Sequence, residues 1–218
     1  MTLRPRTDVG VADWFVSAEA EWNVLATQGP PGFAAYAAVW FDGEETAPYR
    51  ADDELMAQVV ELVAGVTSTT GEVFYGLWDG WGDLYDGGRI YQAANIGWLS
   101  RLLIQPTAPR IRPALEDPVM SGPRVGLAGY REYILFSGSA AQVGHWPTVP
   151  VEFDVPQTLP PASITWPQDR SWFIAADVDP EWLCIGGSAE LVAHVLADER
   201  FDAEPVSYGE LPKERSPE

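Results

Sequence analysis

Two short segments of this 218-residue chain carry acidic and aromatic side chains at spacings that suit chemistry or binding. In one of them, Asp177 and Asp179 lie two residues apart, so their carboxylates project from the same face of an extended strand. Paired carboxylates perform acid–base or glycosidic chemistry when their surroundings separate their pKa values. Asp177 and Asp179 are therefore the acid–base pair of an alternative, enzymatic interpretation. The alternative is structural, because an aspartate followed by a proline, as in Asp179-Pro180, suits a turn at the end of a strand.

The other segment runs from Trp78 to Gly88 and interleaves aromatic, acidic and glycine residues. Glycines allow a partner to approach the backbone closely, and tryptophan and tyrosine are favoured anchors at interfaces. The acids lack the spacing of a helix-loop-helix calcium site, so a basic partner is their expected ligand. A hairpin loop whose tryptophans are buried in the core is the alternative. The candidate partner-binding residues are Trp78, Asp79, Trp81, Asp83, Tyr85 and Asp86.

Nucleophilic, metal and phosphate chemistry receive little support from the sequence. Cys184 lies in an apolar run that predicts a strand, where a buried and inert thiol is the ordinary case. One cysteine and two histidines are too few for a typical zinc site. The segment Gly186-Gly187-Ser188 precedes a predicted helix, but without a following lysine it indicates a helix cap rather than a phosphate loop. We therefore expect no catalytic residue, no metal and no cofactor.

The chain is strongly acidic, because 32 aspartates and glutamates against 13 basic residues give a net charge of −19. Such a charge disfavours non-specific binding to nucleic acids and to anionic membranes. The imbalance is large in residues 177–218, which hold eleven acids and three bases. No apolar run approaches the roughly 18 residues that span a bilayer, and a lone cysteine fits a reducing compartment. We expect a cytoplasmic protein that binds neither nucleic acid nor membrane.

Helical and strand-like patterns follow one another irregularly along the chain. Apolar residues at helical spacing predict helices over residues 7–27, over residues 52–65 and after Ser188. Short apolar runs predict strands over residues 33–41, 72–78, 130–137, 172–178 and 182–185. Because there is no regular strand–helix–strand repeat, we expect a single α+β domain over residues 1–205, with a mixed or mostly antiparallel sheet covered by about three helices. Residues 206–218 are expected to form a flexible acidic tail.

The stretch from residue 166 to residue 188 carries a family resemblance. Its pattern is Trp166-Pro167-x-Asp169-Arg170-x-Trp172, then Asp177-x-Asp179, then Ile185-Gly186-Gly187-Ser188. On this pattern the chain resembles a family of uncharacterised bacterial proteins, mainly actinobacterial, and residues 76–82 and 133–138 look like two further blocks of that family. The resemblance implies a shared fold, and it implies no activity and no catalytic residue.

The charge, the ten tryptophans and the lack of a catalytic set favour a non-enzymatic protein that binds a basic protein partner. Bacterial immunity proteins and other toxin antagonists have this character, and a decoy that mimics nucleic acid is a variant of the same idea. The alternative is a hydrolase or a binding protein for a small or carbohydrate ligand, with Asp177 and Asp179 or the loop acids beside tryptophan rings. The sequence leaves the oligomeric state open.

Overall fold

The computed structural model describes residues 1–41, 50–85, 113–149 and 159–212 of the chain. The strands in these ranges are β1 (Arg4–Pro5), β2 (Ala35–Trp40), β3 (Val73–Trp78), β4 (Val125–Leu127), β5 (Arg131–Gly138), β6 (Ile164–Pro167), β7 (Phe173–Ala175), β8 (Trp182–Gly187) and β9 (Ala203–Val206). They form one sheet in the order β1-β5-β3-β6-β7-β8-β2-β9, and β4 also pairs with β5. All of these pairs are antiparallel.

The helices in the described ranges are short, except for one. They are α1 (Asp13–Val16), α2 (Trp22–Gln28), α3 (Arg50–Val66), α4 (Gly82–Tyr85), α7 (Asp117–Met120) and α8 (Ala189–Ala197), with two 3-10 turns, η1 (Gly10–Ala12) and η2 (Ala140–Gln142). The expected α+β class with an antiparallel sheet is confirmed. The described part of the chain holds six α-helices, where about three were expected.

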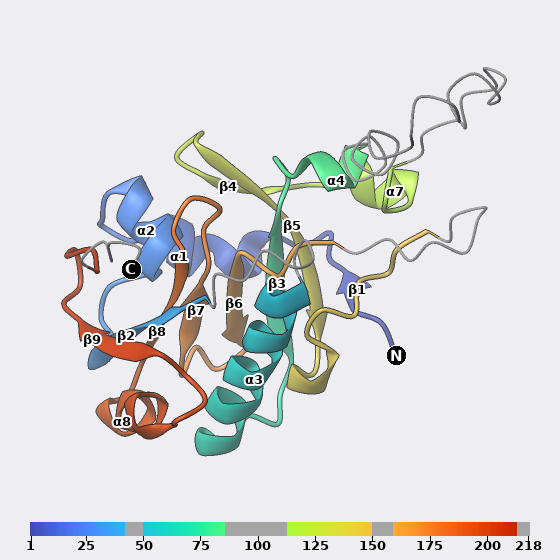
Figure 1. Ribbon diagram of the computed structural model, residues 1–218. Coiled ribbons are helices and arrows are strands. Elements are labelled where there is room, and N and C mark those ends of the chain that lie inside the picture. The colour runs from blue at the N-terminus through green and yellow to red at the C-terminus, as the bar shows by residue number, and fades with distance from the viewer. Residues whose placement is uncertain (42–49, 86–112, 150–158, 213–218) are drawn as a thin grey trace, which may run out of the picture.

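Helices cover both faces of the sheet (Figure 1). α3 and α8 pack on one face together with Tyr75 and Leu77 of β3. η1, α1 and α2 pack on the other face together with Phe74 of β3. Because both faces are covered, the central strands are apolar along their length instead of alternating with polar residues. Among the helices that the structure describes, none combines the length and the apolar character needed to cross a membrane.

The amino-terminal apolar pattern forms three short helical pieces, so the prediction of one continuous helix over residues 7–27 is wrong. η1 and α1 come first, residues 17–21 form no helix, and α2 follows. The break lets Phe15 pack on Phe173 of β7, at 5.0 Å between ring centroids, while Trp22 contacts a different part of the sheet. Packing against two separate places on the sheet thus overrides the local helical pattern.

The carboxyl-terminal part follows the expected order of strand, turn, strand and helix. β7 pairs with β8, and Ser188 caps α8 because its hydroxyl oxygen accepts a hydrogen bond from the N–H of Leu191 at 3.1 Å. β6 and β9 have no counterpart among the predicted strands. β9 contains Pro205 and lies at the edge of the sheet, where a residue without an N–H is tolerated.

Residues beyond the expected domain limit at residue 205 contact the body of the structure. Val206 belongs to β9, and the buried side chain of Gln28 binds the residues that follow. Its Oε1 accepts a hydrogen bond from the N–H of Gly209 at 2.7 Å, and its Nε2 donates to the carbonyl of Glu210. Residues 206–210 are therefore attached to the end of α2, and residues 213–218 of the expected tail lie outside the described part of the chain.

Candidate functional site

Arg131, the first residue of β5, binds both candidate carboxylates of the β7–β8 turn. Its Nε and Nη2 donate to Oδ1 and Oδ2 of Asp177, each at 2.9 Å, and Nη2 also donates to Oδ2 of Asp179 at 3.0 Å. Only 13% of the Arg131 side chain and 5% of the Asp177 side chain are exposed, whereas 81% of the Asp179 side chain is exposed. A two-pronged arginine–carboxylate pair of this kind fixes both side chains in one geometry.

Aromatic rings surround the same guanidinium. Its central carbon lies 5.5 Å from the ring centroid of Trp22 and 5.1 Å from that of Trp78. Trp22 in turn stacks on Tyr130, with 4.5 Å between ring centroids and 17° between ring planes. The guanidinium is thus in cation–π contact with two indoles while it binds two carboxylates. We call Trp22, Trp78, Tyr130, Arg131, Asp177 and Asp179 the Arg131 cluster.

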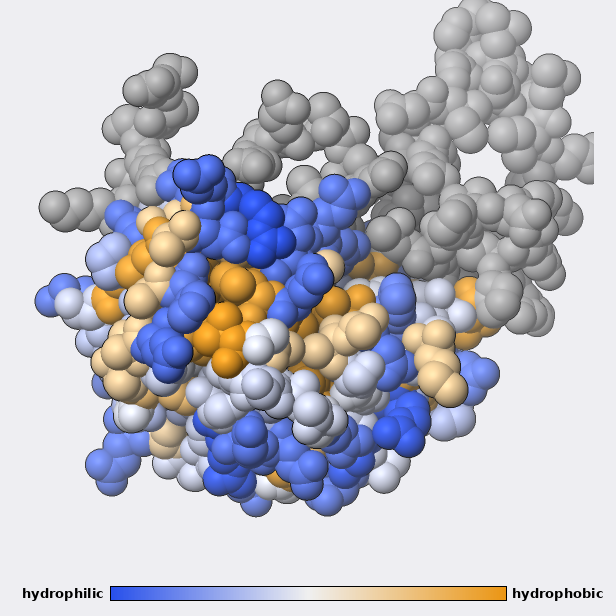
Figure 2. Space-filling model, turned by 90° about the horizontal axis from the view of Figure 1, so that it is seen from below, coloured by the Kyte–Doolittle hydropathy of each residue, from blue (hydrophilic) through white to orange (hydrophobic). Residues whose placement is uncertain are grey.

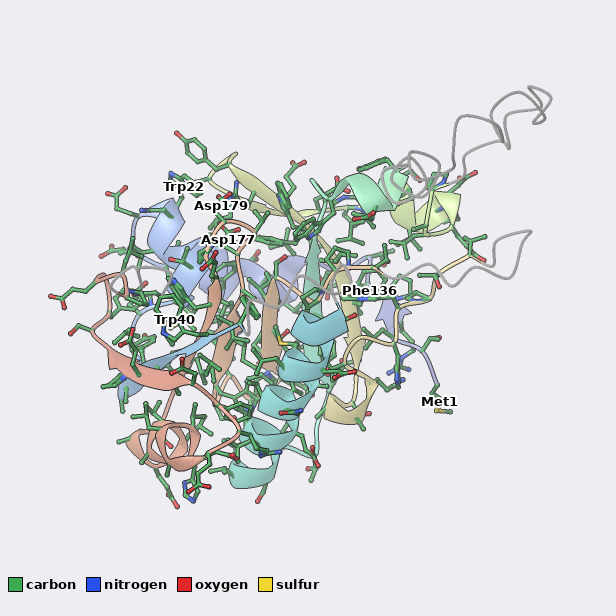
Figure 3. The ribbon with its side chains drawn as sticks, in the orientation of Figure 1. Met1, Trp22, Trp40, Phe136, Asp177 and Asp179 are labelled. Carbon is green, nitrogen blue, oxygen red and sulfur yellow. The ribbon has the colours of Figure 1, made fainter. Side chains whose placement is uncertain are left out.

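The antiparallel sheet explains why these residues meet. β3 ends at Trp78 and β5 begins at Arg131, and Trp78 pairs with Tyr133, so the end of one strand lies beside the start of the other. The β7–β8 turn lies at the same end of the sheet, and α2 begins there with Trp22. Figure 3 shows the labelled Trp22, Asp177 and Asp179 together at this end of the molecule. The two segments singled out by the sequence are therefore brought together, with Arg131 between them.

A close backbone approach fixes the ring of Trp78. A Cβ on Gly80 would lie 2.2 Å from Cζ2 of Trp78, so no side chain larger than hydrogen fits there without a shift. Trp81 also contacts Trp78: the two rings meet edge-on, with 5.5 Å between their centroids. Trp78 is therefore held by its neighbours in the loop as well as by Arg131.

The loop after β3 is partly internal. The carboxylate of Asp79 pairs with Nε of Arg124 at 3.0 Å and accepts a hydrogen bond from the hydroxyl of Tyr85 at 2.7 Å. Trp81 is half-buried and packs against the main core, and Trp78 is also half-buried. Tyr85 is exposed and Asp83 is half-buried. Asp86, the last predicted binding residue, lies outside the described residues.

The charges of the Arg131 cluster are fixed by its contacts. The hydrogen bonds to Asp177 raise the pKa of Arg131, so the guanidinium remains cationic. One positive charge thus meets the carboxylates of Asp177 and Asp179. The fully buried Tyr133 lies close enough for both charges to act on its hydroxyl: burial raises the pKa of Tyr133, and the charge of Asp177 raises it further. That hydroxyl has no hydrogen-bond partner in the described structure.

The remaining candidate chemistry is placed elsewhere. Cys184 is fully buried in β8, and burial raises the pKa of its thiol, which fits the predicted inert thiol. His194 lies on α8, where its Nδ1 contacts the carbonyl oxygen of Glu190 at 2.8 Å. Within the described ranges, no three histidine, cysteine or acidic side chains gather as metal ligands. Gly187 touches Leu191 of α8 closely, so the glycine pair serves packing and the helix cap.

The sequence interpretation missed Trp22, Tyr130, Arg131 and Arg124 as members of this end of the sheet. A signal was present, since Arg131 stands at the start of the apolar run that forms β5. A guanidinium so close to a buried strand needs a carboxylate partner. Residues 128 and 129, with φ of 50° and 77°, form the turn that precedes it.

Comparison of the chain with protein-family models, with curated proteins and with solved structures yields no match. The function therefore has to be argued from the site itself.

Proposed function

We propose that this chain is a non-enzymatic protein that binds a basic protein partner through the end of the sheet that carries the Arg131 cluster. The observation that supports this most is that two residues of the cluster are both exposed to solvent and held in place by contacts. Tyr130 is 61% exposed although its ring is stacked on Trp22, and the Asp179 side chain is 81% exposed although it is bonded to Arg131. An aromatic ring and a carboxylate that are exposed and already fixed lose little freedom when a partner binds.

The charge balance favours a basic partner. The described ranges contain 24 acidic and seven basic residues. Arg4, Arg6, Arg124, Arg131 and Arg200 each contact an acidic side chain, so much of the positive charge of the described ranges is already paired. At the proposed binding end, Asp179 of the cluster is exposed, and so are three acids that adjoin cluster residues in sequence or lie two residues away: Glu21, Glu132 and Glu181. Opposite charge on a partner accelerates association and selects against acidic competitors.

The geometry gives less support to a hydrolase that uses Asp177 and Asp179. Both oxygens of Asp177 are bonded to Arg131, and its side chain is 5% exposed, so a substrate has no access to them. A general acid or base must lie within hydrogen-bond reach of the substrate. A binding role uses the cluster as it stands, with the buried pair as support and the exposed residues as the contact surface.

Antagonists of bacterial toxins are one class of protein that fits this proposal, since an acidic surface suits the binding of a basic toxin. The test is capture of partners by the tagged protein from its own nuclease-treated lysate, at low and at moderate salt. We expect one stoichiometric basic protein that is released as salt rises, since exposed charges are screened.

The capture requires matched variants. Asp179→Asn with Glu181→Gln removes two exposed charges at the binding end, and Glu61→Gln with Glu199→Gln removes two exposed charges near α3 and α8. Loss of the partner with the first pair and retention with the second supports the proposal. A partner retained equally by both pairs, or no basic partner at either salt concentration, contradicts it.

A further inference from the structure

We infer that the partner presents an arginine whose guanidinium stacks on the outward face of Tyr130 and pairs with the carboxylate of Asp179. The inference rests on the proposed function and specifies the chemistry of the group that the site recognises. It follows from the position of Tyr130, from the free oxygen of Asp179, and from the way in which this end of the molecule already binds a guanidinium.

Tyr130 offers one aromatic face to the outside. Its ring stacks on Trp22 at 4.5 Å, and it stands directly before β5, with its N–H bonded to the carbonyl of Leu127 at 3.0 Å. Since one face is covered by Trp22 and the residue is still 61% exposed, the other face is open to solvent. A tyrosine held by stacking and by its backbone is a rigid anchor for a cation.

Asp179 supplies the charge. Its Oδ2 accepts a hydrogen bond from Nη2 of Arg131, while its Oδ1 has no partner within the described part of the chain. The carbonyl oxygen of Tyr130 accepts a hydrogen bond from Nη1 of the same arginine at 3.5 Å. The backbone of Tyr130 and the carboxylate of Asp179 therefore bind the two terminal nitrogens of one guanidinium, so the two residues lie on either side of Arg131.

The inner half of the cluster shows which cation suits this environment. The planar guanidinium of Arg131 binds aromatic rings and a carboxylate at the same time. It contacts the rings of Trp22 and Trp78, and it binds Asp177 by two parallel hydrogen bonds. A partner's guanidinium stacked on the outer face of Tyr130 would likewise contact an aromatic ring and a carboxylate, with Tyr130 and Trp22 between it and Arg131. Lysine fits less well, because its ammonium group is more strongly hydrated and is not planar, so it cannot stack on the ring.

The charge around the cluster disfavours ligands that carry phosphate groups. The exposed acids next to the cluster repel phosphate groups, so the expected occupant is a protein side chain and not a lipid head group or a nucleic acid. The view from below, opposite the Arg131 cluster, mixes apolar and hydrophilic residues (Figure 2). α8 lies on that side and provides a control surface with its neighbouring Glu199.

The experiment compares two probes of equal length and charge, a polyarginine and a polylysine peptide, bound to the full chain and followed by fluorescence anisotropy at low salt. We expect the wild-type chain to favour polyarginine by about fivefold, the scale of a cation–π contact at an exposed site. Tyr130→Ala is expected to abolish this preference, and Tyr130→Phe, which keeps the ring, is expected to retain it.

The charge contribution is tested with a matched pair of variants. Asp179→Asn is expected to weaken polyarginine binding by about fivefold, and Glu199→Gln, which removes the same charge near α8, much less. If one arginine contacts both residues, the loss in the double variant Tyr130→Ala/Asp179→Asn is smaller than the product of the two single losses.

The outcomes separate the inference from the proposed function. Binding of both peptides without a preference, or equal effects of Asp179→Asn and Glu199→Gln, overturns the arginine inference and leaves a diffuse acidic surface. Binding of neither peptide overturns the inference together with the basic-partner proposal. Because circular dichroism reports the fold of each variant, a loss of binding in an unfolded variant is recognised, and Tyr130→Phe then still tests the ring.

Discussion

The substitution Arg131→Met tests whether the Arg131 cluster supports the fold. Methionine keeps much of the side-chain volume and removes the guanidinium. The carboxylate of Asp177, with 5% of its side chain exposed, then has no cation beside it. Breaking a buried ion pair by removing one partner costs about 3–5 kcal/mol, since an uncompensated charge stays in the interior. The lost contacts with Trp22 and Trp78 add about 0.5–1 kcal/mol each.

The expected loss is large for a single domain, whose stability is typically about 5–15 kcal/mol. With a urea dependence of about 2 kcal/mol per molar, a loss of about 4 kcal/mol lowers the unfolding midpoint by about 2 M. Urea titrations followed by tryptophan fluorescence and by far-ultraviolet circular dichroism measure this shift. The agreement of the two signals checks that unfolding is a single transition.

Two further variants assign the effect to the pair. Arg131→Met combined with Asp177→Leu removes both charges and is expected to recover most of the lost stability, because an apolar pair of similar size replaces a buried ion pair at little cost. Arg131→Lys keeps the charge and loses the two-pronged geometry, so an intermediate loss is expected. A loss below about 1 kcal/mol for Arg131→Met, the size seen for exposed pairs, refutes the structural role assigned to this arginine.

Four other predictions follow from closely packed or buried groups. Gly80→Ala is expected to destabilise the fold by about 1–3 kcal/mol, because its Cβ meets the ring of Trp78, while Gly126→Ala, with open space around it, serves as the control in the same urea titration. Tyr133→Phe removes a buried hydroxyl without a partner and is expected to leave stability unchanged or to raise it by about 1 kcal/mol at neutral pH. Because burial raises the pKa values of Tyr133 and Cys184 above their unfolded values, both groups ionise in the unfolded state at a lower pH than in the folded state. The free energy of unfolding should therefore fall as pH rises above about 9, and a flat profile in urea titrations across that range contradicts this. The buried Cys184 is expected to react with a thiol reagent only after unfolding, and modification at the rate of a free thiol under native conditions contradicts its placement.

The elements that could be predicted from the sequence are those with a strong local signal. The apolar runs of β3 and β8 indicate buried strands, and Ser188 after two glycines indicates the start of α8. The amino-terminal pattern misled, because Phe15 and Trp22 share a helical spacing yet pack against different places on the sheet. Such a break depends on tertiary contacts, which a local pattern does not contain.

The candidate site was only partly predictable for a related reason. The sequence pointed to the segment after Trp78 and to the pair Asp177 and Asp179 as separate candidates. Their proximity depends on strand order, since Arg131 lies 46 residues before Asp177 and reaches it only because the start of β5 and the β7–β8 turn lie at the same end of the sheet. Residue types indicated what each segment could bind, and the topology determined that the two bind each other.

The two aspartates therefore differ in role although they are two residues apart and share one arginine. Asp177 is buried and bonded through both oxygens, so Asp177→Asn acts on stability. Asp179 is 81% exposed, and an exposed ion pair contributes only about 0–1 kcal/mol to folding. An exposed carboxylate held in place with one oxygen free does little for the fold, and its position suits contact with a partner. Asp179→Asn should thus weaken binding and leave the urea midpoint nearly unchanged, whereas equal losses of stability in both variants would make the pair a purely structural turn.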